Sequence, residues 1–451
     1  MIVIRSPDDP IAALATPAAS SALAVIRVSG PGSLELLSPL VAGRFDPAAA
    51  RGHTIHRCVL RDGIEDVDEV LVAVYKAPKS YTGEDGAELF CHGSLPVIRR
   101  ILSLLARAGF RAAGPGEFTQ RAFLNGRMGL TQAEAVNEIV RAQTDRARGL
   151  ALQRLGGAIE TRVRKARDAL VDLRASLEAL IDYPDEEADT GVDAGKLEEA
   201  ERMLAELVRS CRHGRMYQEG LRVAIAGATN AGKSSLFNAL LLQDRAIVSE
   251  THGTTRDWLE GTANIEGIPV RLFDTAGLRE AADPLEREGV RRTRELIDGA
   301  DAVLYVVDGT RGTDAADRRF LDGWERPAPL LRVWNKADLP HVQQAPEGFL
   351  LVSAVTGTGI DAVQRDLAEA ALGGAPSDAA EPLVNSERQR DLLSRALEGL
   401  RRLRASLAEG AAPELLAVDC ADATDALGEI TGAVTNDEIL DRMFSRFCVG
   451  K

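Results

Sequence analysis

The stretch "LRVAIAGATNAGKSSL", residues 221–236, decides the fold. Its first six residues form a near-continuous apolar run, which is typical of a buried parallel strand. The run leads directly into the pattern G-x-x-x-x-G-K-S, in which glycines let main-chain N–H groups face phosphate oxygens at the start of a helix. We therefore predict a phosphate-binding loop, in which Lys233 meets the terminal phosphates and the Ser234 hydroxyl ligates Mg²⁺.

Further strands are expected on the C-terminal side of this loop. Near-continuous apolar runs are typical of parallel strands that are covered by helices on both faces, and helical segments separate the runs. We predict one doubly wound α/β domain over residues 216–375. The runs are "IPVRLFD" (268–274), "DAVLYVVDG" (301–309), "PLLRVWNKAD" (329–338) and "FLLVSA" (349–354).

The motif "NKAD", Asn335–Asp338, follows one of these strands, at the edge where such sheets bind ligands. A carboxylate at Asp338 accepts from the two donors on the edge of guanine, whereas adenine presents an acceptor there. Sites built on such hydrogen bonds discriminate by roughly 10⁴-fold or more. Together with "VSA" (352–354), which would complete the base pocket, the motif predicts guanine as the base.

Two segments between the phosphate loop and the base motif have the pattern of a phosphate sensor. In "GTTRD" (253–257), Thr255 can give Mg²⁺ a second hydroxyl and contact the γ-phosphate. In "DTAG", Asp274 would bind Mg²⁺ through its water, and Gly277 could donate its N–H to the same phosphate. Loss of that phosphate would release both segments, which predicts a GTP switch.

The composition limits the class of protein. At 451 residues the chain is too long for one ordinary core, and its 45% apolar and 27% charged residues suit a globular protein. It has no run of about 18 apolar residues and no secretory leader pattern, so we expect a cytoplasmic protein with no membrane segment. Five scattered cysteines suggest neither a disulfide framework nor a zinc site. The net charge of −14 means that any RNA contact needs a local patch or the surface of a partner.

The segments around the α/β domain differ in pattern. Residues 1–120 mix short apolar runs with one helical pattern, which predicts an α+β domain. Residues 121–215 and 376–451 have helical periodicity. These two blocks could form separate bundles, but each looks too thin to bury a core of its own. We therefore favour one discontinuous helical domain into which the α/β domain is inserted.

Several longer segments carry a resemblance to a known family. With the nucleotide motifs, "SYTGEDGAEL", "PGEFTQRAFLNGR", "IDYPDEE" and the terminal "FCVGK" resemble the MnmE (TrmE) family of tRNA-modification GTPases, over nearly the whole chain. The resemblance implies a dimerising N-terminal folate domain and an inserted Ras-like P-loop GTPase domain. It also implies a homodimer that joins the flavoprotein MnmG (GidA) in a hetero-tetramer or larger assembly, with FAD only on that partner. Such complexes install an aminomethyl-type group on the wobble uridine of certain tRNAs.

The resemblance also implies that K⁺ takes the place of the arginine that other GTPases use. Carried onto this chain, Asn230 supplies a side-chain oxygen, Ser249 and Thr251 occupy carbonyl ligand positions, and Thr254 completes the set. The contacts would form when two GTPase domains meet face to face. The whole predicted GTP-contacting set is Asn230, Ala231, Gly232, Lys233, Ser234, Ser235, Ser249, Thr254, Thr255, Asp274, Gly277, Asn335, Lys336, Asp338, Ser353 and Ala354.

The residue that follows Gly277 is Leu278, which cannot orient an attacking water as an amide side chain would. In the family, a glutamate beyond this turn positions the water. It matches Glu286 in this chain, with Glu280 and Glu288 as alternatives, because a carboxylate can act through a further water.

The family's site for one-carbon tetrahydrofolate (formyl or methylene) carries over to Arg27, Glu88, Arg127 and Lys451. Cationic groups suit the glutamyl carboxylates of folate, and an acid suits the donors of its pterin ring. The stretch "ASSA", 19–22, lacks the glycines that usually precede this strand, and without glycine we expect the backbone to approach a ligand less closely.

Three alternatives stay open at this point. The Cys448 thiol either takes part in the modification reaction or is an ordinary cysteine on a docked tail. The N-terminal domain could serve only as a dimerisation scaffold, without folate. A ribosome-assembly or RNA-binding GTPase switch would share the nucleotide motifs, and it predicts a basic RNA-binding module such as a KH domain with a GXXG loop.

Overall fold

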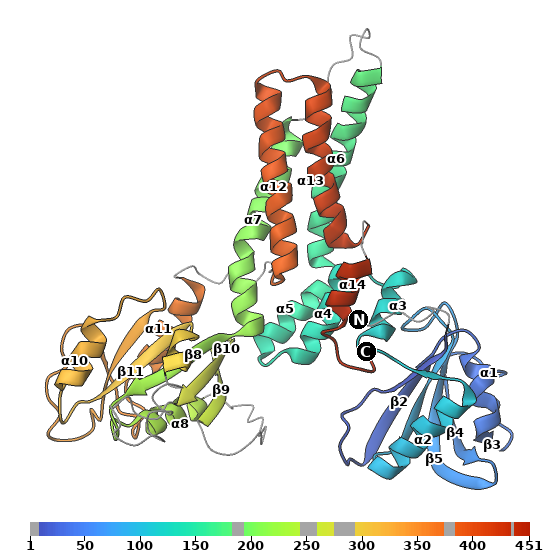
Figure 1. The fold of residues 1–451 in the computed structure, drawn as a ribbon, viewed down its shortest axis with the longest axis horizontal. Coiled ribbons are helices and arrows are strands. Elements are labelled where there is room, and N and C mark those ends of the chain that lie inside the picture. The colour runs from blue at the N-terminus through green and yellow to red at the C-terminus, as the bar shows by residue number, and fades with distance from the viewer. Residues whose placement is uncertain (1–8, 183–193, 244–258, 275–293, 374–383, 434–436) are drawn as a thin grey trace. The chain divides into compact units, whose positions relative to one another are not determined.

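The computed structural model of the protein describes residues 9–182, 194–243, 259–274, 294–373, 384–433 and 437–451 (Figure 1). The chain divides into two compact units, each made of segments that are distant in sequence. The first comprises Met1–Asn137, Leu155–Arg167 and Thr424–Lys451, and the second comprises Glu138–Arg154 and Asp168–Ala423.

A seven-stranded sheet dominates the first unit. Its strand order is β3-β4-β5-β6-β2-β1-β7, and neighbouring strands are antiparallel except for β1 and β7, which are parallel. The predicted α+β character of this part is therefore confirmed. The strands are β1 (Ile11–Leu14), β2 (Leu23–Ser29), β3 (Val41–Ala42), β4 (Thr54–Asp62), β5 (Glu65–Tyr75), β6 (Gly86–His92) and β7 (Arg111–Ala112).

The helix α2 (Leu95–Ala108) covers one face of this sheet. It begins after Ser94, whose hydroxyl accepts from a main-chain N–H of the first turn, and it ends at Gly109, which has a φ of 111°. Its apolar residues share a core with Ile26 of β2 and Leu89 of β6. Because side chains alternate along a strand, Arg27 and Glu88 lie on the other face of the sheet. The remaining short helices of this region are α1 (Ser33–Leu37), η1 (Ser38–Leu40) and α3 (Glu117–Leu124).

A six-stranded sheet in the second unit has the order β13-β12-β11-β8-β10-β9. All five strands that the apolar runs predict are present and parallel. The sixth, β9, pairs antiparallel with β10 and was not predicted, because glycine and alanine dilute its apolar pattern. The strands are β8 (Leu221–Gly227), β9 (Leu259–Ile265), β10 (Ile268–Asp274), β11 (Ala302–Asp308), β12 (Leu330–Asn335) and β13 (Phe349–Leu351).

Both faces of the second sheet are buried. Along β8, Val223 and Ile225 belong to one apolar core, whereas Ala224 and Ala226 belong to the core on the opposite face. This alternation confirms a doubly wound domain with helices on both faces. The helices are α8 (Lys233–Gln243) and α11 (Ile360–Leu372) on the first face and α10 (Ala315–Asp322) on the second.

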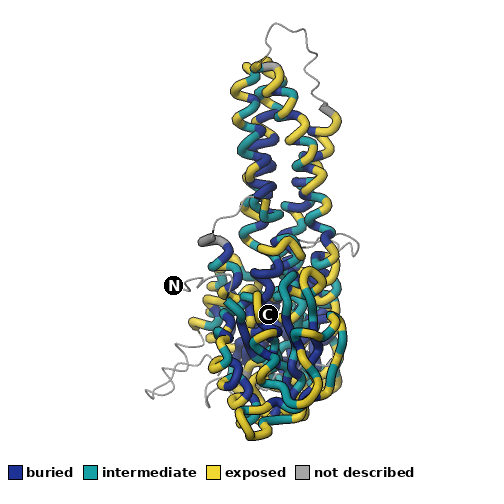
Figure 2. The backbone as a smooth tube through the Cα atoms, turned by 90° about the vertical axis from the view of Figure 1, so that its right-hand side faces the viewer, coloured by how far each residue is buried: buried dark blue, intermediate teal, exposed yellow. Residues whose placement is uncertain are grey.

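Helices from both helical blocks of the sequence pack together in one bundle. On α12, Arg404 pairs with Glu198 and Glu201 of α7, and Arg402 pairs with Asp419 of α13. Since α7 leads into β8 and α12 follows the α/β segment, that segment is inserted into the bundle, which confirms the prediction of one discontinuous helical domain over two separate bundles. Figure 2 shows the buried residues on the facing sides of these helices. The bundle consists of α6 (Ala158–Asp182), α7 (Ala194–Glu219), α12 (Glu387–Ala408) and α13 (Pro413–Thr431), and the other helices of the two blocks are α4 (Leu130–Arg141), α5 (Asp145–Leu155) and α14 (Asp437–Phe444).

One short segment packs against the α/β domain although its pattern is helical like that of the bundle. The hydroxyl of Thr144, just before α5, donates a 2.7 Å hydrogen bond to the main-chain oxygen of Gly267 in the β9–β10 turn. The guanidinium of Arg146 lies 5.5 Å from the ring centre of Tyr217.

The domain boundaries at residues 120, 215 and 375 remain predictions.

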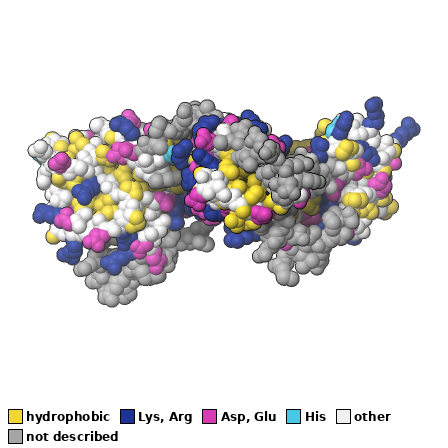
Figure 3. Space-filling view, turned by 90° about the horizontal axis from the view of Figure 1, so that it is seen from above, with side chains coloured by type: hydrophobic (Ala, Val, Ile, Leu, Met, Phe, Trp, Pro, Cys, Tyr) yellow, Lys and Arg dark blue, Asp and Glu magenta, His cyan; other side chains and the backbone are white. Residues whose placement is uncertain are grey.

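Two features relate to the expected RNA and membrane contacts: how charge is distributed over the surface, and whether any helix could span a membrane. On the face shown in Figure 3, basic and acidic side chains of the described residues are interspersed. Within the part of the chain that the structure describes, no helix is both long enough and apolar enough to cross a bilayer.

Candidate functional site

The loop between β8 and α8 adopts a backbone that favours glycine at defined points. Asn230 has a φ of 65° and Gly232 a φ of 94°, both in the left-handed region. A Cβ atom on Gly232 would lie 2.1 Å from the Nδ2 atom of Asn335. Glycine is therefore needed at position 232 both for its conformation and for the close approach of the asparagine.

Lys233 begins α8 and turns its side chain back over the loop. Its Nζ atom donates to the main-chain oxygens of Gly227, at 3.2 Å, and Ala228, at 2.9 Å. Burial lowers the pKa of Lys233, and the charge of Asp274 offsets this only in part. A bound phosphate would supply the negative charge that this buried ammonium group lacks.

Ser234 and Asp274 form the second polar pair at this edge of the sheet. The Ser234 hydroxyl donates a 2.5 Å hydrogen bond to the Oδ2 atom of Asp274. Asp274 is only 9% exposed, and its buried Oδ1 atom accepts no hydrogen bond from the described residues. A hydroxyl beside a buried carboxylate with an unused oxygen is a donor set that fits Mg²⁺.

Asn335, at the end of β12, connects the phosphate loop to the base side of the site. Its Nδ2 atom donates to the main-chain oxygen of Ala231 at 2.9 Å, and its Oδ1 atom accepts from the Ala354 N–H at 3.1 Å. The side chain is 2% exposed. Both of its polar atoms are thus used in holding two loops together.

Asp338 and Ser353 lie together as the predicted base pocket requires. The hydroxyl of Ser353, which is fully buried, donates a 2.7 Å hydrogen bond to the Oδ1 atom of Asp338. The carboxylate itself is exposed. Ser353 therefore fixes the direction of a carboxylate that stays accessible to the donors of a base.

Lys336 contacts a residue that the sequence analysis did not single out. Its backbone has a φ of 68°, and its Nζ atom donates to the Oδ2 atom of Asp308 at 2.6 Å. Burial alone would raise the pKa of Asp308, but hydrogen bonds from Lys336 and Thr310 lower it overall. The signal was available, because Asp308 ends β11 at the same edge of the sheet as the nucleotide motifs.

The structure describes only some of the remaining residues that are predicted to contact the nucleotide. Asn230 and Ser235 are exposed on the loop and on the first turn of α8. The others lie outside the described residues: Ser249, Thr251, Thr254, Thr255, Gly277 and Glu286, together with Leu278 and the alternatives Glu280 and Glu288.

A second polar cluster lies on the face of the N-terminal sheet opposite α2. The guanidinium of Arg27 donates to the Oε1 atom of Glu88 at 2.9 and 2.7 Å, and to the main-chain oxygen of Gly450 at 3.3 Å. The guanidinium carbon lies 5.3 Å from the ring centre of Tyr81 and 5.6 Å from that of Phe118. The side chains of Arg27 and Glu88 are 23% and 19% exposed, so they are not ordinary surface charges.

The C-terminal tail is docked beside this cluster. The Gly116 N–H donates to the main-chain oxygen of Cys448 at 3.3 Å. Gly450 has a φ of 91°, and a Cβ atom there would lie 2.5 Å from the main-chain oxygen of Leu14. Burial, and then repulsion from Arg27, lower the pKa of Lys451. Cys448 itself is exposed as a free cysteine.

The structure brings together three of the four predicted folate residues. Arg27, Glu88 and Lys451 lie in the cluster just described, whereas no contact among the described residues joins Arg127 to them. Arg127 is exposed and lies against Gly83. The aromatic residues Tyr81 and Phe118 were missed, although each lies within a segment that carries the family resemblance.

The comparisons with known proteins agree with this arrangement. The family model "GTP-binding protein TrmE N-terminus" matches residues 10–127, and the model "MnmE helical domain" matches residues 130–448. Two curated relatives, both described as "tRNA modification GTPase MnmE", come from Geobacter sulfurreducens and Moorella thermoacetica. Each is 42% identical and aligns with 98% of this chain, over 99% and 100% of its own length.

Several solved structures align with part of the chain. One of them, a variant of Aquifex aeolicus Era bound to GDP and AlF₄⁻, is 24% identical, and the alignment covers 40% of this chain and 66% of that one. Its TM-score of 0.28 is too low to support a fold assignment, which rests on the strand order and the family models. The two family models and the full-length relatives establish that the chain belongs to the MnmE (TrmE) family.

Proposed function

We propose that this chain is a GTP hydrolase that acts in tRNA modification. The observation that carries the proposal is the position of Asn335, whose side chain joins the phosphate loop to the loop of the base pocket. The buried Lys233 and the exposed carboxylate of Asp338 support it, because one suits a polyphosphate and the other suits guanine. The role in tRNA modification is supported by the descriptions of the relatives.

In the proposed reaction, this chain's groups bind and orient the triphosphate. Main-chain N–H groups of the loop and the Lys233 ammonium group hold the phosphates. Ser234, Asp274 and Thr255 would hold Mg²⁺, which neutralises charge on the β- and γ-phosphates when it is bound. Gly277 would report the presence of the γ-phosphate through its N–H.

We further propose that hydrolysis requires K⁺ and a second copy of the chain. Asn230, Ser249, Thr251 and Thr254 would hold the ion, which supplies positive charge near the β,γ-bridge when it is bound. Glu286 would orient the attacking water, either directly or through a second water. Asn230 is exposed on the phosphate-binding loop, so its side chain is accessible to a second GTPase domain that would complete the ligand set of the ion.

The N-terminal cluster is the proposed site for a one-carbon tetrahydrofolate. Arg27 and Lys451 would meet its glutamyl carboxylates, with Arg127 contributing from the turn after α3, and Glu88 would accept from the pterin ring. The folate would supply the carbon for an aminomethyl-type group on wobble uridine, in a complex with the flavoprotein MnmG (GidA), which alone holds FAD. Cys448 is exposed beside this site, as a thiol that takes part in the reaction would have to be.

The test of the GTPase proposal is Asp338→Asn. A carboxylate accepts from the two N–H donors of guanine, whereas an asparagine places a donor against a donor. We expect GTP affinity to fall by about 100-fold or more, and xanthosine triphosphate, which has an oxygen in place of the guanine amino group, to bind better than GTP. Asp361→Asn, on the exposed first turn of α11, is the matched control and should bind GTP normally. Unchanged GTP affinity in Asp338→Asn would refute the proposed base pocket.

A further inference from the structure

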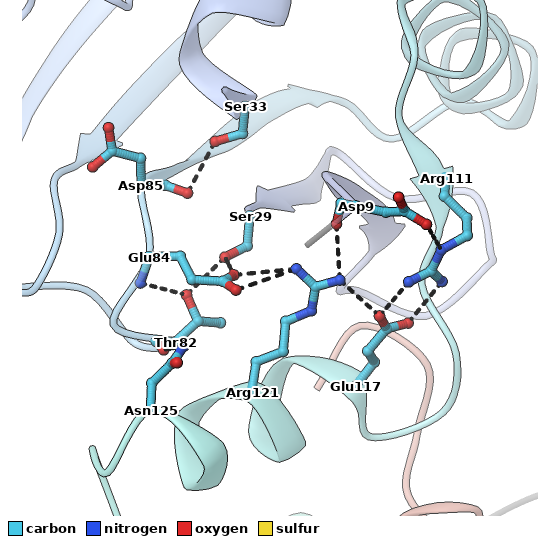
Figure 4. Close-up of polar contacts among 10 residues, drawn as sticks. All are labelled: Asp9, Ser29, Ser33, Thr82, Glu84, Asp85, Arg111, Glu117, Arg121 and Asn125. Atoms are coloured by element: carbon cyan, nitrogen blue, oxygen red, sulfur yellow. Dashed lines mark hydrogen bonds and ion pairs between the residues drawn. The ribbon is translucent and has the colours of Figure 1, made fainter. Parts of the chain in front are cut away.

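Arg121, on α3, lies at the centre of a buried network of charged side chains in the N-terminal unit (Figure 4). Its side chain is 4% exposed. The Nη1 atom donates to the carboxylate of Glu84 at 3.3 Å, and the Nη2 atom donates to the Oε1 atom of Glu117 at 3.0 Å and to the main-chain oxygen of Asp9 at 2.8 Å. One guanidinium group therefore connects α3 to the 76–85 loop and to the segment that precedes β1.

From Glu84 the network continues to Ser29, at the end of β2, and back to Thr82 in the 76–85 loop. The Glu84 carboxylate accepts from the Ser29 hydroxyl at 2.7 Å, and that hydroxyl lies 2.7 Å from the hydroxyl of Thr82. The Asn125 side chain, just after α3, donates to the main-chain oxygen of Thr82 at 2.7 Å. Polar contacts thus hold the 76–85 loop to α3 at two points, Arg121 within the helix and Asn125 just after it.

The 76–85 loop and α3 also carry the two rings that flank Arg27. Tyr81 immediately precedes Thr82 of the network, and Phe118 immediately follows Glu117. The hydroxyls of Tyr81 and Thr119 lie 2.8 Å apart, which closes the loop against the helix on the side of the Arg27 cluster. The network therefore fixes the spacing between the two rings that enclose the guanidinium.

Net stabilisation is a weak explanation for this network. The side chains of Glu84 and Glu117 are 14% and 15% exposed, and the buried Nε atom of Arg121 has no hydrogen-bond partner among the described residues. Buried ion pairs are often no more stabilising than apolar residues of the same volume, because desolvation offsets their attraction. What such a network provides is a defined geometry, since each charge must keep its partners.

We propose that Arg121 is a positioning residue for the Arg27 cluster: it holds Tyr81 and Phe118 against the Arg27 guanidinium, and so fixes the direction in which that guanidinium meets an anionic ligand. Arg121 does not touch the ligand itself. The inference rests on the proposed folate function, and it adds to that function the element that pre-organises the pocket. Sites of this kind lose affinity when the groups behind the contacting residues are altered, by roughly 10- to 100-fold in well-studied metal sites.

The test is Arg121→Lys in the full-length chain. Lysine keeps the charge but cannot bridge Glu84 and Glu117 as the guanidinium does. Two measurements are made: calorimetric titration with 5-formyltetrahydrofolate, and amide hydrogen exchange of the ligand-free protein. We expect about tenfold weaker folate binding, and faster exchange confined to the 76–85 loop and α3. The matched control is Arg100→Lys, a partly exposed arginine on α2 that pairs with Glu65, and it should change neither measurement.

Each result of these two measurements either supports or overturns the positioning role of Arg121. Unchanged exchange in the loop and in α3, or exchange that rises equally across the whole sheet, would overturn the positioning role, as would folate binding equal to that of the wild type. If the wild type itself does not bind 5-formyltetrahydrofolate, the proposed folate function fails. In that case the exchange pattern of the ligand-free proteins alone supports or overturns the role of Arg121.

Discussion

The side chain of Asn335 donates a 2.9 Å hydrogen bond to the main-chain oxygen of Ala231, which lies 104 residues earlier in the chain. The same side chain accepts from the N–H of Ala354 in the base loop. One buried amide thus fixes the distance between the part of the site that faces the phosphates and the part that faces the base. Ligand contacts on either side are therefore coupled through this residue.

The first prediction concerns this bridge. Replacing Asn335 by alanine removes two buried hydrogen bonds and leaves a main-chain oxygen and an N–H unpaired, at a cost of about 1–3 kcal/mol for each unsatisfied group. GTP and GDP should both bind about 10- to 100-fold more weakly, because the loss does not depend on the γ-phosphate. Fluorescence titration with labelled nucleotides measures both affinities. Asn238→Ala, exposed on α8, should bind normally, and normal binding by Asn335→Ala would contradict the bridge.

The second prediction separates binding from hydrolysis. Glu286→Gln removes the carboxylate that is proposed to orient the attacking water, so the hydrolysis rate should fall by about 10²- to 10⁴-fold. GTP affinity should stay the same, because the residue is not assigned a ligand contact. Glu280→Gln and Glu288→Gln are the matched controls and should hydrolyse GTP at the wild-type rate. If all three variants keep that rate, no nearby glutamate orients the water.

The third prediction concerns the C-terminal tail. Deleting "FCVGK", residues 447–451, removes Gly450 and Lys451 from the Arg27 cluster but leaves the nucleotide site intact. GTP hydrolysis should therefore persist, while wobble-uridine modification, measured by mass spectrometry of tRNA from complemented cells, should stop. Cys448→Ser then distinguishes the two hypotheses for the thiol. If the variant loses tRNA modification, the thiol takes part in the reaction; if modification is normal, Cys448 is an ordinary cysteine on a docked tail. Continued modification by the deleted chain would remove the tail from the reaction.

The fourth prediction concerns acid stability. Burial alone would raise the pKa of Glu117, but hydrogen bonds from Arg111, the Gly114 N–H and Arg121 lower it below the ordinary 4.5. A carboxyl whose pKa is lowered by folding stabilises the folded state fully above about pH 4.5, and this stabilisation is lost as the pH falls through the folded value. Exchange of buried amides in the N-terminal sheet, followed from neutral to acidic pH, should show a smaller loss of stability for Glu117→Gln than for the wild type. Equal losses would contradict an ionised Glu117 in the folded state.

The sequence predicts most of the α/β domain because its signals are local. Near-continuous apolar runs marked five strands, and the glycine pattern placed the phosphate loop between β8 and α8. β9 was missed because Gly261 and Ala263 weaken its pattern, and its place in the sheet comes from pairing with β10. The bond between Thr144 and Gly267 could not be predicted, because it joins segments 123 residues apart.

Residues of the candidate sites were likewise predictable where a local motif marks them, and not where distant segments meet. Asn335 and Asp338 were found from a short motif, whereas Asp308 was not, because a single aspartate at the end of a strand has many possible roles. In the N-terminal domain, only the family resemblance pointed to Arg27 and Glu88, since charge and spacing alone would make them surface residues. The network around Arg121 depends on contacts between distant segments. The alternative of a ribosome-assembly GTPase is disfavoured, because the two family models together match residues 10–127 and 130–448.

The most direct test of the proposed mechanism is the rate of GTP hydrolysis in buffers that contain K⁺, Na⁺ or Cs⁺ as the only monovalent cation. The wild type should hydrolyse GTP much faster in K⁺, and Asn230→Ala should lose this preference, because the side-chain oxygen proposed to bind the ion is gone. Thr229→Ala, at the preceding exposed position of the loop, should keep it. Equal wild-type rates in all three cations would contradict the account, as would an unchanged K⁺ preference in Asn230→Ala.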